Sequence, residues 1–136
     1  MIPRVLIVDD EPALRRTLER ALTGHGYEVV SVGDPHSAYQ VIGESNIDLV
    51  LLDLRLPQMA GDTLFLAIVR RWPRLLSRII LMSGDPWAQQ ADWPTELIGC
   101  PVLQKPFTID TLVRTVHQVL AAAEPNSDFL EGNGNR

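Results

Sequence analysis

Short runs of apolar residues alternate along the chain with stretches whose apolar residues recur at helical spacing. The apolar runs predict strands over Arg4–Val8, Glu28–Val32, Asp48–Leu52, Arg78–Met82 and Pro101–Leu103. The third run is apolar after its first residue, which is typical of a strand buried on both faces. The last run begins with a proline, which an edge strand tolerates. Strands that alternate with helices predict βαβ units and a parallel sheet.

The first three helices are predicted from apolar spacing together with signals at their ends. Helical spacing predicts a helix over Pro12–Thr23, with Gly24 as its terminator. The Asp34-Pro35 pair predicts the N-cap and the first residue of a second helix. A third helix is expected over Asp62–Trp72, because Pro73 disfavours its continuation.

The remainder of the chain predicts two more helices and a polar tail. The segment Asp85–Gly99 is expected to hold a fourth helix, which Pro86 and Pro94 keep short. Thr108 predicts the cap of a final amphipathic helix. From residue 124 the chain is polar, rich in glycine and without periodicity. We therefore expect one domain over residues 1–123 and a disordered tail over residues 124–136.

Five polar residues follow the predicted strands closely, and they are the candidate site. Alternating strands and helices predict an α/β doubly wound sheet, whose ligands bind outside the carboxyl ends of the strands. The residues at or just beyond those ends are Asp9, Asp10, Asp53, Ser83 and Lys105. We expect all of them on one rim of the sheet.

This set of residue types predicts phosphoryl chemistry on a carboxylate. Three carboxylates on one rim repel one another unless a cation lies between them, and such oxygen ligands suit Mg²⁺. Lys105 adds a point charge for a phosphate oxygen. Each residue alone has an ordinary interpretation: Asp9 and Asp10 at a helix N-terminus, Asp53 in a turn, Lys105 in solvent. Their occurrence together on one rim favours the metal and phosphoryl site.

Composition narrows the class of protein. A chain of 136 residues predicts one domain, and its formal net charge of −5 argues against direct nucleic-acid binding. No stretch is apolar for long enough to span a bilayer, so we expect no membrane association. The single cysteine, Cys100, excludes an internal disulfide and fits the cytoplasm. We interpret it as a small buried hydrophobe rather than a nucleophile.

The motifs, taken in order, resemble those of response-regulator receiver domains. They are Val8-Asp9-Asp10-Glu11, Asp53 followed by Pro57 and Gly61, Ser83-Gly84, and Lys105-Pro106-Phe107. Each motif alone is weak, but their order and spacing together are specific. The resemblance extends from about Arg4 to Ala123, and it implies a flavodoxin-like five-stranded sheet of order 2-1-3-4-5 with five helices.

The resemblance also implies a role for each motif residue. Asp53 would be the phosphoacceptor, and Asp9, Asp10 and Asp53 would hold Mg²⁺ together with the main-chain carbonyl of Arg55. Ser83 would donate a hydrogen bond to the phosphoryl group. Lys105 would pair with a phosphoryl oxygen, and the bond that it makes with the next proline would be cis. The phosphoryl donor would be a sensor histidine kinase or a histidine phosphotransfer protein.

Three further positions would modulate signalling in such a domain. Most members of the family carry Tyr or Phe three residues before the lysine, where this chain has Val102. The aromatic part of the usual switch is therefore missing, and the output route is expected to differ. Arg55 and Asp85 each follow a site residue by two positions, and the resemblance implies that they flank the path of the hydrolytic water.

We therefore expect a stand-alone receiver that signals by contact with an unidentified protein and is not a turnover enzyme. It would assist only its own phosphorylation and dephosphorylation. A receiver taken from a longer protein is an open alternative. Two other functions also stay open: a small Mg²⁺-dependent phosphatase or phosphotransferase with an aspartyl-phosphate intermediate, and a receiver fold that binds partners without being phosphorylated.

Overall fold

The computed structural model describes residues 2–56, 58–84 and 94–123. The strands are β1 (Arg4–Val8), β2 (Glu28–Val32), β3 (Leu49–Asp53), β4 (Ile79–Ser83) and β5 (Val102–Gln104). The helices are α1 (Pro12–Gly24), α2 (Pro35–Glu44), α3 (Gly61–Arg71), α5 (Thr95–Ile98), α6 (Ile109–Ala123) and the short 3-10 helix η1 (Pro73–Leu75). The predicted alternation of strands and helices is confirmed.

All strands of the sheet are parallel, in the order β2-β1-β3-β4-β5. Val8 of β1 lies opposite both Val32 of β2 and Leu52 of β3, so these strands end side by side. Asp53 lies opposite Met82 of β4. The register therefore brings the residues at the ends of β1, β3 and β4 to the same rim, as predicted.

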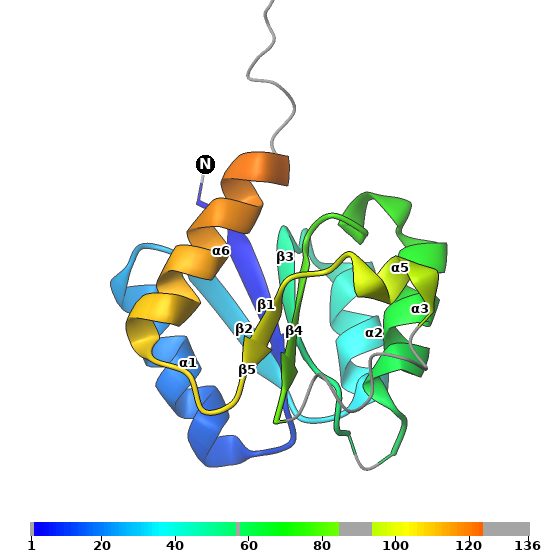
Figure 1. The fold of residues 1–136 in the computed structure, drawn as a ribbon, viewed down its shortest axis with the longest axis horizontal. Coiled ribbons are helices and arrows are strands. Elements are labelled where there is room, and N and C mark those ends of the chain that lie inside the picture. The colour runs from blue at the N-terminus through cyan, green and yellow to red at the C-terminus, as the bar shows by residue number, and fades with distance from the viewer. Residues whose placement is uncertain (1, 57, 85–93, 124–136) are drawn as a thin grey trace, which may run out of the picture.

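Helices cover both faces of the sheet (Figure 1). Helices α1 and α6 lie on one face, and α2, α3 and α5 lie on the other. Along β1, Val5 and Ile7 pack with the α1 and α6 side, whereas Leu6 and Val8 pack with the opposite side. Because successive side chains of a strand point to opposite faces, both faces of β1 are buried. This explains why its sequence is apolar without interruption.

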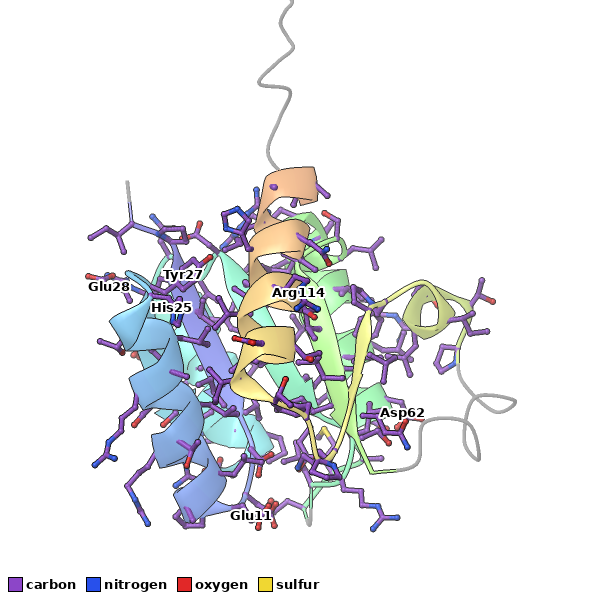
Figure 2. All side chains as sticks on the ribbon, turned by 60° about the vertical axis from the view of Figure 1, so that its left-hand side comes forward. Glu11, His25, Tyr27, Glu28, Asp62 and Arg114 are labelled. Atoms are coloured by element: carbon purple, nitrogen blue, oxygen red, sulfur yellow. The ribbon has the colours of Figure 1, made fainter. Side chains whose placement is uncertain are left out.

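The rim that carries the candidate site lies at the lower edge in Figures 1 and 2. Glu11, between β1 and α1, is labelled at that lower edge, while Glu28 at the start of β2 lies toward the opposite end. Parallel strands share one direction, so the loops that leave their carboxyl ends gather at the lower edge.

Two predicted helix caps are confirmed by their hydrogen bonds. The Asp34 carboxylate accepts the backbone N–H of Ser37 at 2.8 Å, and Pro35 begins α2. The Thr108 hydroxyl accepts the backbone N–H of Thr111 at 3.1 Å. Each side chain satisfies an N–H of the first helical turn that has no partner within the helix.

The first helix ends at Gly24, one residue later than expected, and the prediction of Gly24 as its terminator is wrong. Gly24 is still helical, and the terminating glycine is Gly26, with a φ of 92°. The N–H groups of Gly26 and Tyr27 return to the carbonyls of Thr23 and Leu22, both at 3.1 Å. This pair of bonds is a Schellman motif, which requires a left-handed residue after the helix. The sequence pattern allows either Gly24 or Gly26 to end the helix. Only Gly26 adopts the left-handed conformation.

Other boundaries shift by about one residue, as helix and strand ends commonly do. Asp53 and Ser83 are the last residues of β3 and β4 rather than the first residues beyond them. Within Asp85–Gly99, the described part holds the four-residue helix α5, while residues 85–93 lie outside the described residues. Residues 124–136, expected to form a disordered tail, also lie outside them. In the described part of the chain, none of the helices has the length and apolar character needed to cross a bilayer.

Candidate metal and phosphoryl site

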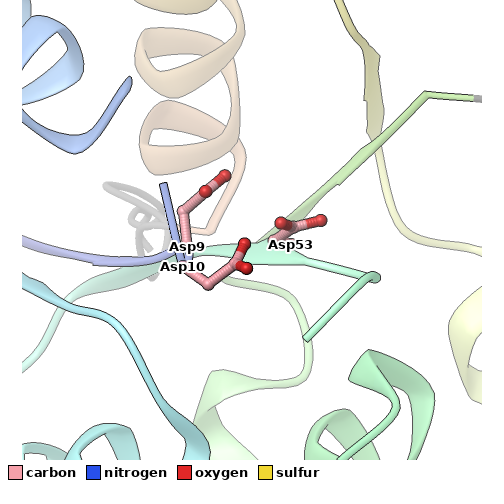
Figure 3. Close-up of side chains that lie close together, drawn as sticks. All are labelled: Asp9, Asp10 and Asp53. Atoms are coloured by element: carbon pink, nitrogen blue, oxygen red, sulfur yellow. The ribbon is translucent and has the colours of Figure 1, made fainter. Parts of the chain in front are cut away.

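Asp9, Asp10 and Asp53 meet at the rim of the sheet, at the ends of β1 and β3 (Figure 3). Each offers a carboxylate oxygen, and these oxygens all lie within 4.8 Å of one another. Asp9 is completely buried and Asp53 is 3% exposed, whereas Asp10 is exposed. The cluster thus has a buried part in the sheet and an open side at Asp10.

Backbone N–H groups hold the two buried carboxylates in place. The Oδ1 atom of Asp9 accepts the N–H of Glu11, and Oδ1 of Asp53 accepts the N–H of Arg55, both at 2.9 Å. Each bond closes a turn of the same kind, from a carboxylate to the amide two residues further on. One oxygen of each buried carboxylate is therefore oriented by its own strand-to-loop turn.

Lys105 links the two carboxylates through their second oxygens. Its Nζ atom lies 2.8 Å from Oδ2 of Asp9 and 3.4 Å from Oδ2 of Asp53. The Lys105 backbone N–H donates to the carbonyl of Ser83 at 2.8 Å, which ties the lysine to the end of β4. The bond between Lys105 and Pro106 is cis, as the resemblance implies.

The electrostatics of the site follow from burial and from these contacts. Burial raises the pKa of Asp53 above its ordinary value, and the Asp9 carboxylate acts in the same direction. The Arg55 amide and Lys105 oppose this rise. Burial on its own lowers the pKa of Lys105, but its hydrogen bond with Asp9 and the two negative charges outweigh burial and raise it. Lys105 is therefore held in its charged form.

The donor set fits a small hard cation. Carboxylate oxygens are the ligands that Mg²⁺ prefers, and Mg²⁺ usually keeps several waters beside one or two carboxylates. The carboxylates of Asp9, Asp10 and Asp53 supply such oxygens, and the exposed Asp10 leaves room for waters. The cluster repels itself without a cation, and Lys105 supplies part of the compensating charge.

An open cavity of about 560 Å³ gives access to the site from the side of Asp10. Its lining residues come from the β1–α1 loop and from the segment between β3 and α3, and they are Asp10, Leu54, Arg55, Leu56, Gln58, Met59 and Ala60. The carboxylate cluster is therefore open to the surface beside Asp10 and Arg55.

The other predicted positions have mixed outcomes. Ser83 is buried at the end of β4, on the same rim as the carboxylates. Val102 is half-buried and packs against the core on the side of α2 and α3. The Arg55 side chain is exposed, and Asp85 lies outside the described residues. The modulatory roles of Arg55, Asp85 and Val102 stay predictions.

Cys100 lies apart from this rim, between α5 and β5. Burial raises the pKa of its thiol to about 11, so it is protonated at neutral pH. A thiol that stays protonated is a poor nucleophile. The interpretation of Cys100 as a small buried hydrophobe is confirmed.

Sequence reasoning missed the structural role of Gly61, which begins α3. A Cβ atom at this position would lie 2.5 Å from Cα of Leu54 and 2.6 Å from the carbonyl oxygen of Asp53. The Gly61 N–H donates to the carbonyl of Leu54 at 3.1 Å. Only glycine allows α3 to start this close to the end of β3. The available sequence signal is that Gly61 belongs to the motif that follows Asp53, which does not reveal this close approach.

The five-stranded parallel sheet, with carboxylates and a lysine on one rim, defines a flavodoxin-like receiver fold, and comparison with known proteins agrees. Residues 5–117 match the model of the response regulator receiver domain. The chain therefore belongs to the response regulator receiver domain family, the input module of two-component response regulators.

Curated relatives are similar over nearly all of this chain. It is 30% identical over 124 residues to the transcriptional regulatory protein GlrR of Escherichia coli, covering 91% of this chain and 28% of that protein. It is 30% identical over 131 residues to the transcriptional regulatory protein KdpE of Mycobacterium tuberculosis, covering 93% of this chain and 57% of that protein. The chain thus spans only part of the length of these relatives.

Solved structures show the same fold. The signal receiver domain of a putative Luxo repressor protein from Vibrio parahaemolyticus superposes with a TM-score of 0.82 at 26% identity, covering 97% of this chain and 99% of that chain. A CheY-like response regulator receiver domain protein from Methanospirillum hungatei has a TM-score of 0.82 at 23% identity, covering 90% and 97%. These comparisons confirm the flavodoxin-like order of the sheet.

Proposed function

We propose that this domain accepts a phosphoryl group on a carboxylate oxygen of Asp53, with Mg²⁺ held by Asp9, Asp10, Asp53 and the main-chain carbonyl of Arg55. One observation supports this most strongly: buried Asp53 ends the central strand within reach of both an acidic pair and Lys105. Phosphoryl transfer needs positioning and charge neutralisation more than covalent help from the protein. The rim offers both.

The donor in this proposal is the phosphohistidine of a sensor histidine kinase or of a histidine phosphotransfer protein. The P–N bond to the imidazole breaks, a P–O bond to Asp53 forms, and the released imidazole nitrogen takes up a proton. When bound, Mg²⁺ would neutralise negative charge on the phosphoryl oxygens. The donor would approach through the cavity beside Asp10 and Arg55.

The chain's own residues have separate tasks in this transfer. The Arg55 N–H orients Asp53 through Oδ1. Lys105, held in its charged form by the two carboxylates, would turn one of its donors to a phosphoryl oxygen. Ser83, at the end of the neighbouring strand, would donate its hydroxyl to another phosphoryl oxygen. Arg55 and Asp85 would modulate attack by water.

We further propose that the domain acts in the cytoplasm and signals by contact with a protein partner. The relatives GlrR and KdpE are transcriptional regulatory proteins of which this chain matches only part. Their output therefore does not identify the partner of this chain. Because Val102 replaces the usual aromatic residue, we propose that the signal leaves through the loops around Ser83 rather than through a side chain of β5.

Labelling tests this proposal. The protein is incubated with Mg²⁺ and an acyl phosphate, and the label is located by intact mass and peptide mapping. We expect one phosphoryl group on Asp53, none on Asp53→Asn, and normal labelling of Asp110→Asn, a change at an exposed carboxylate on α6. Stoichiometric label on the Asp53→Asn variant would contradict the assignment. Turnover of a generic phosphomonoester would favour a phosphatase, and an unlabelled wild type would favour a binding module.

A further inference from the structure

Arg15, on the first turns of α1, reaches back to the acidic pair that precedes its own helix. Its Nη1 atom donates to the backbone carbonyl of Asp9 at 2.6 Å. The Arg15 side chain is half-buried, unlike that of the exposed Arg16 beside it. A hydrogen bond from a guanidinium is stronger than one from a neutral donor, so this contact is a substantial restraint on the Asp9 carbonyl.

Gly33, just after β2, provides the surface on which this guanidinium lies. A Cβ atom at Gly33 would be 2.8 Å from Nη1 and 3.4 Å from Cζ of Arg15. The Asp9 N–H donates to the carbonyl of Val32, the residue before Gly33, at 3.1 Å. The ladder between β1 and β2 therefore ends at Asp9, and Arg15 caps the next carbonyl along the chain.

The carbonyl that Arg15 binds belongs to the peptide that joins Asp9 to Asp10. A peptide group is planar, so restraining its oxygen restrains the directions in which both residues leave it. Asp9 has three further restraints, at its N–H and at both carboxylate oxygens. For Asp10, the structure gives no comparable side-chain bond among the described residues. Asp10 is therefore held through its two peptides, the preceding one by Arg15 and the following one by the bond from the Glu11 N–H to Asp9.

We propose that Arg15, seated on Gly33, is a positioning residue that orients the Asp9-Asp10 pair for the cation. The inference rests on the proposed Mg²⁺ site. Residues that hold metal ligands in place tune the affinity of the site, and their loss typically costs about 10- to 100-fold in metal affinity. A positive charge near a cation site also repels the cation. The hydrogen bond of Arg15 to the Asp9 carbonyl would raise Mg²⁺ affinity, and its positive charge would lower it. Because the signs are opposite, the two effects can be separated.

Two substitutions remove the contact in different ways. Arg15→Met removes the hydrogen bond and the charge, whereas Gly33→Ala displaces the flexible guanidinium and keeps the charge. Arg16→Met is the matched control, because it removes the same charge from an exposed position on the same helix. We expect Mg²⁺ affinity, measured by calorimetry, to fall about tenfold in Gly33→Ala. It should fall by less in Arg15→Met, because that change also removes a charge that repels the cation. Arg16→Met should leave it unchanged.

The double variant gives an internal check. Because both changes abolish one contact, Arg15→Met with Gly33→Ala should bind Mg²⁺ no more weakly than the worse single variant. Tighter binding by Arg15→Met would show that Arg15 acts only as a repelling charge and would overturn the proposal. Unchanged affinity in Gly33→Ala, with the Arg15 side chain displaced, would overturn it as well.

A metal-free measurement separates this inference from the metal site itself. In the absence of Mg²⁺, amide exchange of Asp10 followed by NMR should accelerate in Arg15→Met and Gly33→Ala but not in Arg16→Met. Equal exchange in all four proteins would overturn the positioning role. A wild type that binds no Mg²⁺ but shows this exchange pattern would reject the proposed metal site while leaving the positioning of the Asp9-Asp10 pair by Arg15 supported.

Discussion

The ammonium group of Lys105 lies 2.8 Å from Oδ2 of Asp9, a carboxylate with no exposed surface. Its distance to the proposed phosphoacceptor, Asp53, is longer, at 3.4 Å. In this structure Lys105 therefore compensates the charge of Asp9 first. Its release from Asp9 would be part of any movement toward a phosphoryl group on Asp53.

The first prediction concerns the charge balance at this rim. Lys105→Met leaves two buried carboxylates beside each other without their lysine, and we expect unfolding by urea to show a loss of about 2–4 kcal/mol without Mg²⁺. Mg²⁺ should restore more stability to the variant than to the wild type, because it supplies the missing positive charge. The exposed ion pair of Arg4 with Glu28 provides the control. Arg4→Met should cost only about 0–1 kcal/mol. Equal losses in the two variants would contradict this account.

The second prediction concerns the close approach of α3 to β3. Gly61→Ala places a Cβ against backbone atoms of Asp53 and Leu54, which cannot rotate away as a side chain can. We expect a loss of about 1–3 kcal/mol in the free energy of unfolding. Because one of the displaced atoms belongs to Asp53, labelling by an acyl phosphate should also slow.

Gly99→Ala is the control for this change. Gly99 has a φ of −80°, and apart from its chain neighbours no atom of the described residues lies within 4 Å of an added Cβ. Gly99→Ala should therefore leave the free energy of unfolding unchanged, or raise it by about 0.5 kcal/mol because the unfolded chain becomes less flexible. If Gly61→Ala leaves the free energy of unfolding as unchanged as Gly99→Ala does, the close approach of Gly61 to β3 does not require a glycine.

The third prediction concerns pH and the N-cap of α2. The backbone and side-chain hydrogen bonds from Ser37 hold the pKa of Asp34 below its ordinary value of 3.8. A carboxyl with a lowered folded-state pKa binds fewer protons in the folded state than in the unfolded state. Its stabilising contribution is therefore complete above the ordinary value and is lost as pH falls through the lowered one.

Asp34→Asn keeps a good capping side chain but does not titrate, so it isolates this effect. We expect the wild type to lose stability relative to Asp34→Asn as acid is added, in urea titrations at a series of pH values. Asp34→Ala should be less stable than both near neutral pH, because it has no cap. A constant difference between wild type and Asp34→Asn across the acidic range would rule out the shift.

The fourth prediction concerns the end of α6. Arg78 donates to the carbonyl of Asp48 at 3.3 Å and to the carbonyl of Ala123, the last residue of α6, at 3.2 Å. Arg78→Met should lose about 1–3 kcal/mol, since two carbonyls lose a charged donor. Hydrogen exchange in the last turn of α6 should accelerate. Arg114→Met, at an exposed position of the same helix, should change neither measurement. If hydrogen exchange in the last turn of α6 is unchanged in Arg78→Met, the hydrogen bond from Arg78 to Ala123 does not stabilise the end of this helix.

Much of the fold and the centre of the candidate site follow from local sequence. The strands β1, β3 and β4 are buried on both faces, so their sequences are continuous apolar runs that stand out without any structure. The polar residues that end them necessarily share a rim once the strands are parallel. Caps such as Asp34 and Thr108 are also local, because each bonds an amide three residues away.

The sequence by itself therefore determined the order of the elements and the gathering of Asp9, Asp10, Asp53, Ser83 and Lys105. Only the tertiary structure decided which of two nearby glycines ends α1, how closely Gly61 approaches β3, and that Arg15 binds the Asp9 carbonyl over Gly33. The physical reason is distance along the chain. Periodicity and capping act within a few residues, whereas these contacts depend on how strands and helices pack against one another, and a long side chain can reach many different partners until that packing selects one.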